Sequence, residues 1–136
     1  MAFVLDASVA LAWAFADEND HPIATRAANL LMTGSEAACV PELWRYEVRN
    51  ILLMSERRGR ISEDGTVQFL LQISQLRIEM DAEQQDRPLL VLARRHKLTI
   101  YDAAYLALAI RKHLPLATLD KALSSAAAVE GVPVLG

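Results

Sequence analysis

The sequence lacks most residues that mark secreted, membrane-bound or zinc-binding proteins. Cys39 is the single cysteine among 136 residues, which excludes an internal disulfide and a cysteine-based zinc site. No apolar run is long enough to span a bilayer, and the first residues do not form a basic leader followed by an apolar stretch. We therefore expect a cytoplasmic protein that does not associate with membranes.

Several common catalytic motifs are also missing. The histidines His21, His96 and His113 have no metal-ligand spacing to one another, and we expect them at the surface or in loops. There is no Ser-His-Asp or Cys-His set, no glycine loop that cradles phosphate, and no dinucleotide fingerprint. Acidic side chains are therefore the main candidates for chemistry.

The composition predicts one domain over residues 1–136, because 53% of the residues are hydrophobic and the chain is long enough to bury a core. The net charge of −3 argues against broad, nonspecific affinity for nucleic acid. Basic residues nevertheless cluster late in three expected helices, where they either complement the helix dipole or contact phosphate. The clusters are Arg57, Arg58 and Arg60; Arg94, Arg95 and Lys97; and Arg111 and Lys112.

Strands and helices are expected to alternate along the chain, which predicts a compact α/β domain with a parallel sheet. Residues 3–5 are continuously apolar, as in a strand that is covered on both faces. Further strands are expected at residues 37–40, 76–80, 116–118 and 133–135. Helices are expected at residues 8–15, 22–34, 41–59, 62–75, 84–96 and 102–112, with a short one after residue 120.

Two carboxylates occupy unusual places in this pattern. Asp6 ends the first strand, and open parallel sheets form their ligand sites at the carboxyl ends of their strands. The alternative role for Asp6 is to cap the next helix, but Ser8 can cap that helix instead. Glu47 lies on the apolar side of its helix, since Leu43, Trp44 and Ile51 are three or four residues away. An inward carboxylate needs a cation, a hydrogen-bond donor or a raised pKa, so a buried salt bridge is the alternative.

Asp102 and Asp120 are less distinctive taken singly. Asp102 precedes a helix that is apolar on nearly every side, and Asp120 follows a short strand, so both are also candidates for ordinary N-caps. Thr118 offers a nearby hydroxyl for a water or a ligand oxygen. Together with Asp6 and Glu47, these acids suggest a shared pocket for Mg²⁺, or Mn²⁺ as a substitute, because these ions prefer oxygen ligands. Such a site favours phosphodiester hydrolysis through a metal-activated water.

Four segments of the chain resemble PIN-domain ribonucleases, and specifically the VapC-type toxins of bacterial toxin–antitoxin pairs. They are Val-Leu-Asp-Ala-Ser-Val, Pro-Glu-Leu-Trp-Arg-Tyr-Glu-Val-Arg-Asn-Ile-Leu, Leu-Thr-Ile-Tyr-Asp-Ala-Ala-Tyr-Leu-Ala-Leu-Ala and Leu-Ala-Thr-Leu-Asp. The resemblance implies a three-layer α/β/α fold with a central parallel sheet. It also implies one or two Mg²⁺ ions held mainly by Asp6 and Asp102, with Glu47 and Asp120 completing the cluster and activating water.

The resemblance further implies an endoribonuclease that cuts tRNA, rRNA or mRNA, inhibits translation, forms a homodimer and is neutralised by a cognate antitoxin. Candidate residues for the protein contacts are apolar, with core packing as the alternative for each. They are Trp13, Phe15, Trp44, Leu52, Leu53 and Phe69.

Two other functions fit the same class of fold. One is a PIN-like RNA- or protein-binding module without catalysis, which metal-binding calorimetry would distinguish because it predicts no Mg²⁺ or Mn²⁺ binding. The other is a phosphotransfer domain with Asp6 as phosphoryl acceptor. The sequence argues against this second function, because it has no second acid beside Asp6 and no lysine on a late strand.

Overall fold

The computed structural model describes residues 2–15, 17, 20–83 and 85–135. Within these ranges, eleven elements follow one another along the chain. They are β1 (Ala2–Leu5), α1 (Ala7–Ala12), α2 (Pro22–Met32), β2 (Ala37–Pro41), α3 (Leu43–Arg57), α4 (Glu63–Ser74), β3 (Ile78–Asp81), α5 (Asp86–His96), α6 (Ile100–Lys112), β4 (Leu116–Ala117) and α7 (Lys121–Val129). No helix in the described ranges is both long and apolar enough to cross a membrane.

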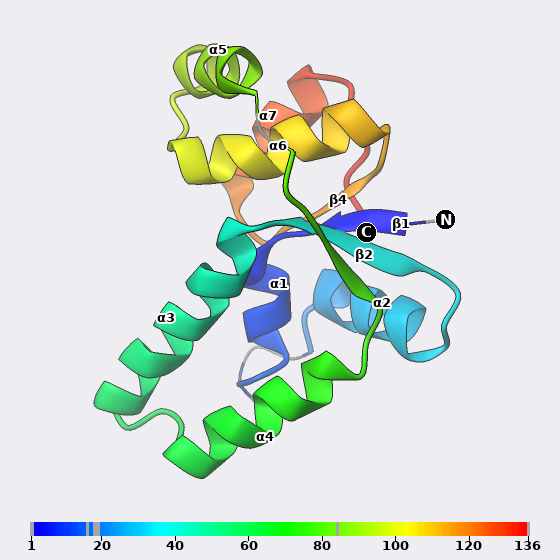
Figure 1. The fold of residues 1–136 in the computed structure, drawn as a ribbon. Helices are drawn as coiled ribbons and strands as arrows, with labels where there is room; N and C mark the ends of the chain where they lie inside the picture. The colour runs from blue at the N-terminus through cyan, green and yellow to red at the C-terminus, as the bar shows by residue number, and fades with distance from the viewer. Residues whose placement is uncertain (1, 16, 18–19, 84, 136) are drawn as a thin grey trace.

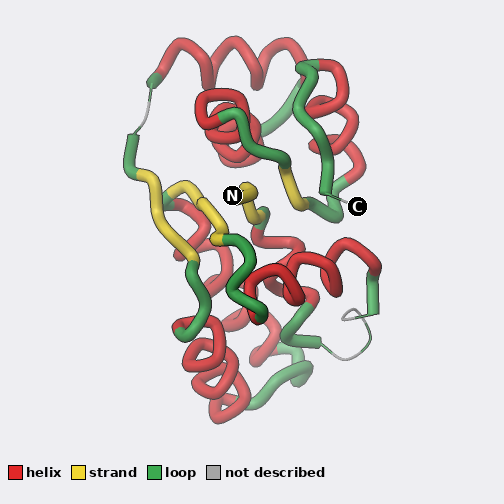
Figure 2. Tube along the Cα trace, turned by 90° about the vertical axis from the view of Figure 1, so that its right-hand side faces the viewer, coloured by secondary structure: helices red, strands yellow, loops and turns green. Residues whose placement is uncertain are grey.

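The central sheet is parallel and has the strand order β3-β2-β1-β4. Helices α1 to α4 lie on one side of it and α5 to α7 on the other, in both views (Figures 1 and 2). This arrangement confirms the predicted three-layer α/β/α architecture. Phe3, Val4 and Leu5 of β1 are fully buried, as expected for a continuously apolar strand between two helical layers.

Most predicted elements are present, with shifted ends. The strand predicted at 76–80 begins two residues later and ends one residue later, as β3. The helix predicted from Pro41 begins at Leu43, because Pro41 still belongs to β2. The predicted strand 133–135 is reduced to one bridge between Leu116 and Val134. Helix α3 is followed by Gly59 with φ of 73°, a left-handed conformation that glycine adopts without steric cost.

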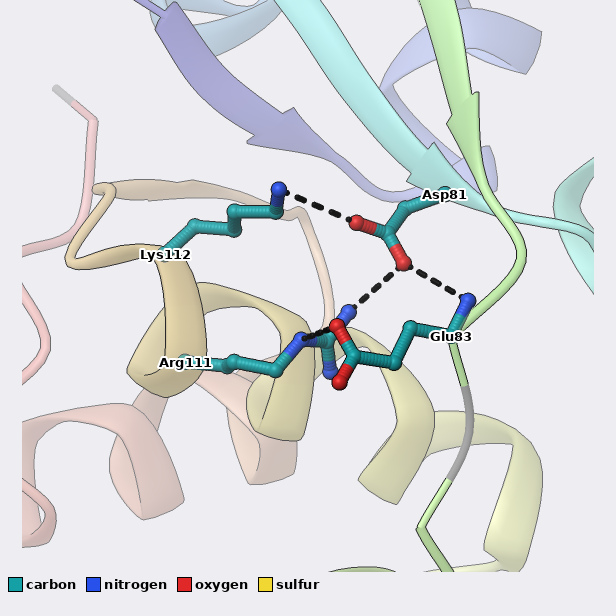
Figure 3. Close-up of polar contacts among 4 residues, drawn as sticks. All are labelled: Asp81, Glu83, Arg111 and Lys112. Atoms are coloured by element: carbon teal, nitrogen blue, oxygen red, sulfur yellow. Dashed lines mark hydrogen bonds and ion pairs between the residues drawn. The ribbon is translucent and has the colours of Figure 1, made fainter.

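An ion-pair network ties the edge strand β3 to the end of α6 (Figure 3). Asp81 Oδ1 accepts hydrogen bonds from Arg111 Nη2 at 2.7 Å and from the Glu83 backbone N–H at 2.9 Å. Lys112 Nζ lies 3.3 Å from Asp81 Oδ2, and Arg111 Nε lies 3.2 Å from a Glu83 carboxylate oxygen. Partial burial opposes ionisation of Asp81, but these donors and cations together hold its pKa below the usual range.

Replacing Asp81 is expected to destabilise the domain. Asp81→Asn should lower the free energy of unfolding by about 1–3 kcal/mol at neutral pH, because the side chain is 12% exposed and the negative charge that pairs with Arg111 and Lys112 is lost. The folded-state pKa is depressed, so this stabilisation is present above the unfolded pKa of about 3.9 and is lost as pH falls through the folded pKa. Urea unfolding at pH 7 and pH 3 measures the difference.

Glu79→Gln is the matched control, because Glu79 is on the same strand and its side chain is 68% exposed, 3.8 Å from Arg77. Exposed pairs of this kind contribute little to stability, so we expect no measurable change. An Asp81→Asn effect of equal size at pH 3 and pH 7 would contradict an electrostatic role.

Candidate active site

Asp6 lies at the carboxyl end of β1, where the chain turns into α1. Its backbone N–H donates to the Ala117 carbonyl at 3.0 Å, which extends the pairing of β1 with β4. The residue is 6% exposed, and its carboxylate oxygen Oδ2 accepts hydrogen bonds from Ser8 Oγ and Thr118 Oγ1, both at 2.7 Å. Asp6 is therefore a buried carboxylate whose oxygen Oδ2 is held by two hydroxyl groups, one from α1 and one from the residue that follows β4.

The structure corrects the predicted cap of α1. Asp6 occupies the N-cap position, but its side chain forms no capping hydrogen bond, and Ser8 lies inside the helix. Ser8 Oγ instead donates to Asp6 and accepts from the Leu119 backbone N–H at 3.0 Å. Thr118 Oγ1 likewise accepts from the Asp120 N–H at 3.0 Å while it donates to Asp6. The two hydroxyls thus join the β4–α7 connection to Asp6.

Glu47 projects from α3 towards α6, and the hydroxyl of Tyr105 on α6 donates to its oxygen Oε1. Glu47 is half-buried and lies on the inward face of α3, next to the buried residues Trp44, Val48 and Leu52. The alternative of a buried salt bridge is wrong for the described part of the chain, because no Lys, Arg or His there pairs with Glu47. Its partner is a neutral donor.

Asp102 and Asp120 lie near the starts of two different helices, where they occupy different positions. Thr99 is the N-cap of α6, and its hydroxyl accepts from the Asp102 N–H at 3.1 Å. The alternative reading of Asp102 as an N-cap is therefore wrong, and its half-buried carboxylate is not used for capping. Asp120 is the N-cap of α7, and its Oδ1 accepts from the Leu123 N–H at 3.1 Å. A capping role takes only one oxygen of Asp120.

The four acids influence one another electrostatically although they come from distant parts of the chain. Burial raises the pKa of Asp6, and the negative charge of Asp120 adds to that increase. Burial also raises the pKa of Glu47, with further contributions from the charges of Asp6 and Asp102. The pKa of Asp102 is raised by burial and then by Asp120 and Asp6. Asp6 and Asp102 therefore each lie within electrostatic range of both Glu47 and Asp120, which links the four acids in one negatively charged neighbourhood.

This neighbourhood suits a hydrated divalent ion. In the described ranges, no three His, Cys, Asp or Glu side chains are arranged to enclose a metal ion by themselves. Mg²⁺ does not require such an enclosure, because it keeps several waters and uses one or two carboxylates. The donors are all oxygens, and no described Lys, Arg or His pairs with these acids. Both facts fit a hard cation.

Each basic cluster has at least one member that pairs with an acid of the same chain. Arg111 and Lys112 contact Asp81, as described above, and Arg95 lies 2.8 Å from a Glu130 carboxylate oxygen. Arg60 pairs with Asp17 at 3.0 Å and stacks on Phe15, whose centroid is 4.2 Å away. For these residues, internal ion pairing explains the charge better than phosphate binding does.

One further prediction needs correction, and one alternative is confirmed. His96 was expected at the surface or in a loop, but it is half-buried within α5 and its Nε2 lies 2.6 Å from Glu130. For four of the six candidate partner-binding residues, the alternative of core packing is confirmed: Phe15, Trp44, Leu52 and Phe69. Trp13 is partly buried and donates from Nε1 to the Ala24 carbonyl at 2.9 Å, whereas Leu53 is exposed.

Sequence reasoning did not identify Tyr105 as a site residue, because it lies in a run of apolar residues and resembles core packing. Tyr105 follows Asp102 by three positions, a spacing that places both on neighbouring parts of the helix surface. That spacing was the available indication. Burial and the bond to Glu47 raise the pKa of Tyr105 far above its usual range, so the phenol remains a donor.

Comparison with known proteins gives concordant results. Residues 3–129 match the family model for the PIN domain. The chain is 34% identical over 128 residues to Ribonuclease VapC3 from Pyrobaculum aerophilum, covering 91% of this chain and 93% of that protein. The fold is similar to the crystal structure of PAE2754 from the same organism, with a TM-score of 0.72 and 21% identity, covering 93% of this chain and 84% of that one.

Proposed function

Because the chain belongs to the PIN domain family, as a VapC-type member, we propose that it is a Mg²⁺-dependent endoribonuclease that acts as the toxin of a toxin–antitoxin pair. The observation that carries the proposal is that Asp6 and Asp102 lie within electrostatic range of both Glu47 and Asp120. None of these four acids pairs with a described Lys, Arg or His. The name of the relative, Ribonuclease VapC3, supports RNA as the substrate.

The family resemblance implies a role for each carboxylate, and the contacts of each one are compatible with that role. Asp6 and Asp102 would hold the ion, since Asp6 is fixed by two hydroxyls and Asp102 is not the N-cap of its helix. Glu47 and Asp120 orient the attacking water, and Glu47 accepts its proton at Oε2, because Oε1 is bonded to Tyr105. When bound, Mg²⁺ lowers the pKa of that water and neutralises charge on the attacked phosphate.

We propose further that residues 1–136 form one PIN domain that works in the cytoplasm as a homodimer and is blocked by a cognate antitoxin. Exposed apolar side chains on α3 and α4, including Leu53, Val67 and Leu71, support a protein partner. A groove of about 610 Å³ beside α5 and α6, with an apolar lining that includes Leu89 and Ile100, supports a second contact surface.

The test of the proposed function is to map RNA cut sites. Purified protein is incubated with Mg²⁺ and, in turn, with total tRNA, rRNA and a defined mRNA, and new 5′ ends are sequenced. We expect discrete cuts at a few positions in one class of RNA, because an acidic chain has little general affinity for RNA. Intact RNA of every class with either Mg²⁺ or Mn²⁺ would overturn the proposal in favour of a binding module.

A further inference from the structure

The bond between Tyr105 and Glu47 links the two helical layers next to the acids. Tyr105 is fully buried in α6, and its hydroxyl donates to Oε1 of Glu47 on α3. Among the described residues, no hydrogen bond is made to the other oxygen, Oε2. Glu47 therefore has one oxygen fixed by the protein and one available to a ligand.

We infer that Tyr105 is a positioning residue, whose hydroxyl holds the Glu47 carboxylate in the orientation that a divalent ion or its bound water requires. This inference rests on the proposed function, because it assigns Glu47 to the metal site. It adds a residue that touches neither the ion nor the RNA. Partners that orient a ligand in this way typically change metal affinity or activity about 10–100-fold when removed.

Glu47 needs such a partner because neighbouring carboxylates repel its negative charge. The negative charges of Asp6 and Asp102 act on Glu47, and its long side chain has rotamers that reach solvent. Without a donor, like-charge repulsion favours those outward rotamers. The Tyr105 hydroxyl is attached to a rigid, buried ring, so it holds Glu47 inward before any cation arrives.

Tyr105→Phe tests the inference, because it removes the hydroxyl and keeps the ring that packs in the core. We expect the affinity for Mn²⁺, measured by calorimetry on the full chain, to fall about 10–100-fold. The matched control is Tyr46→Phe, which removes the hydroxyl of a 71% exposed tyrosine beside Glu47 on α3. Its Mn²⁺ affinity should equal that of the wild type.

A double-mutant cycle with Glu47→Gln separates positioning from a general structural role. If Tyr105 acts through Glu47, Tyr105→Phe should cause no further loss of Mn²⁺ affinity in the Glu47→Gln background. A structural role predicts the same loss in both backgrounds. The rise in melting temperature on adding Mn²⁺ gives a second reading of the same comparison, independent of any change in the metal-free melting temperature.

The outcomes distinguish this inference from the proposed function. If the wild type binds Mn²⁺ and cuts RNA but Tyr105→Phe binds Mn²⁺ equally well, the inference is overturned and the proposed function stands. If the wild type neither binds Mn²⁺ nor cuts RNA, both are overturned. A Tyr105→Phe chain that does not fold would make Tyr105 a structural residue and would also overturn the inference.

Discussion

Asp6→Asn is expected to abolish RNA cleavage while the domain remains folded. Asp6 is buried at the end of β1 and is one of the two proposed principal ligands, so its loss should exceed the roughly 100-fold upper range seen for partners that only orient a ligand. The amide oxygen of Asn can still accept from Ser8 and Thr118, which preserves the local hydrogen bonds. Cleavage of the mapped RNA, with circular dichroism to check folding, measures the effect.

Asp64→Asn is the matched control for this variant. It removes the same charge from an exposed residue in the first turn of α4, so cleavage should stay at the wild-type level. Induction in cells should arrest growth with the wild type and Asp64→Asn, but not with Asp6→Asn. If Asp6→Asn cuts RNA as fast as the control does, Asp6 is not a ligand and the proposed site is wrong.

Removal of divalent metal is expected to stop cleavage completely and reversibly. Excess EDTA should leave the RNA intact, and Mg²⁺ or Mn²⁺ added beyond the chelator should restore the same cut sites, because oxygen ligands bind both ions. The melting temperature should fall when EDTA removes the ion and rise again when the ion is restored. An ion at 100 times its dissociation constant stabilises the folded state by about 2.7 kcal/mol. EDTA saturated with Mg²⁺ beforehand is the control. Cleavage that continues in excess EDTA would exclude the metal mechanism.

The sequence predicted which residues surround the candidate site better than it predicted their contacts. The position of Asp6 at the end of the first strand could be predicted because a buried parallel strand has a continuous apolar run, and here that run ends in an acid. Glu47 was placed on an inward face because helical periodicity can be read directly from spacing. Both predictions depend on local patterns, which one stretch of sequence contains in full.

The contacts depend on tertiary structure that no local pattern contains. Serine is a residue type that favours N-cap positions, but in the fold the Ser8 hydroxyl bridges Asp6 and the backbone N–H of Leu119. Thr99 lies nearer the true start of α6 than Asp102, and helix ends are where sequence patterns are least sharp. The partner of Glu47 lies 58 residues away on another helix, so only the tertiary structure reveals Tyr105.

The pairing of β1 with β4 has a consequence for the timing of synthesis. Asp6 is among the first residues made, but the hydroxyl of Thr118 that fixes it, and Asp120 beyond that, are separated from it by more than 100 positions. In a growing chain, Asp6 therefore lacks the Thr118 hydroxyl and the neighbouring charge of Asp120 until β4 and the start of α7 have left the ribosome.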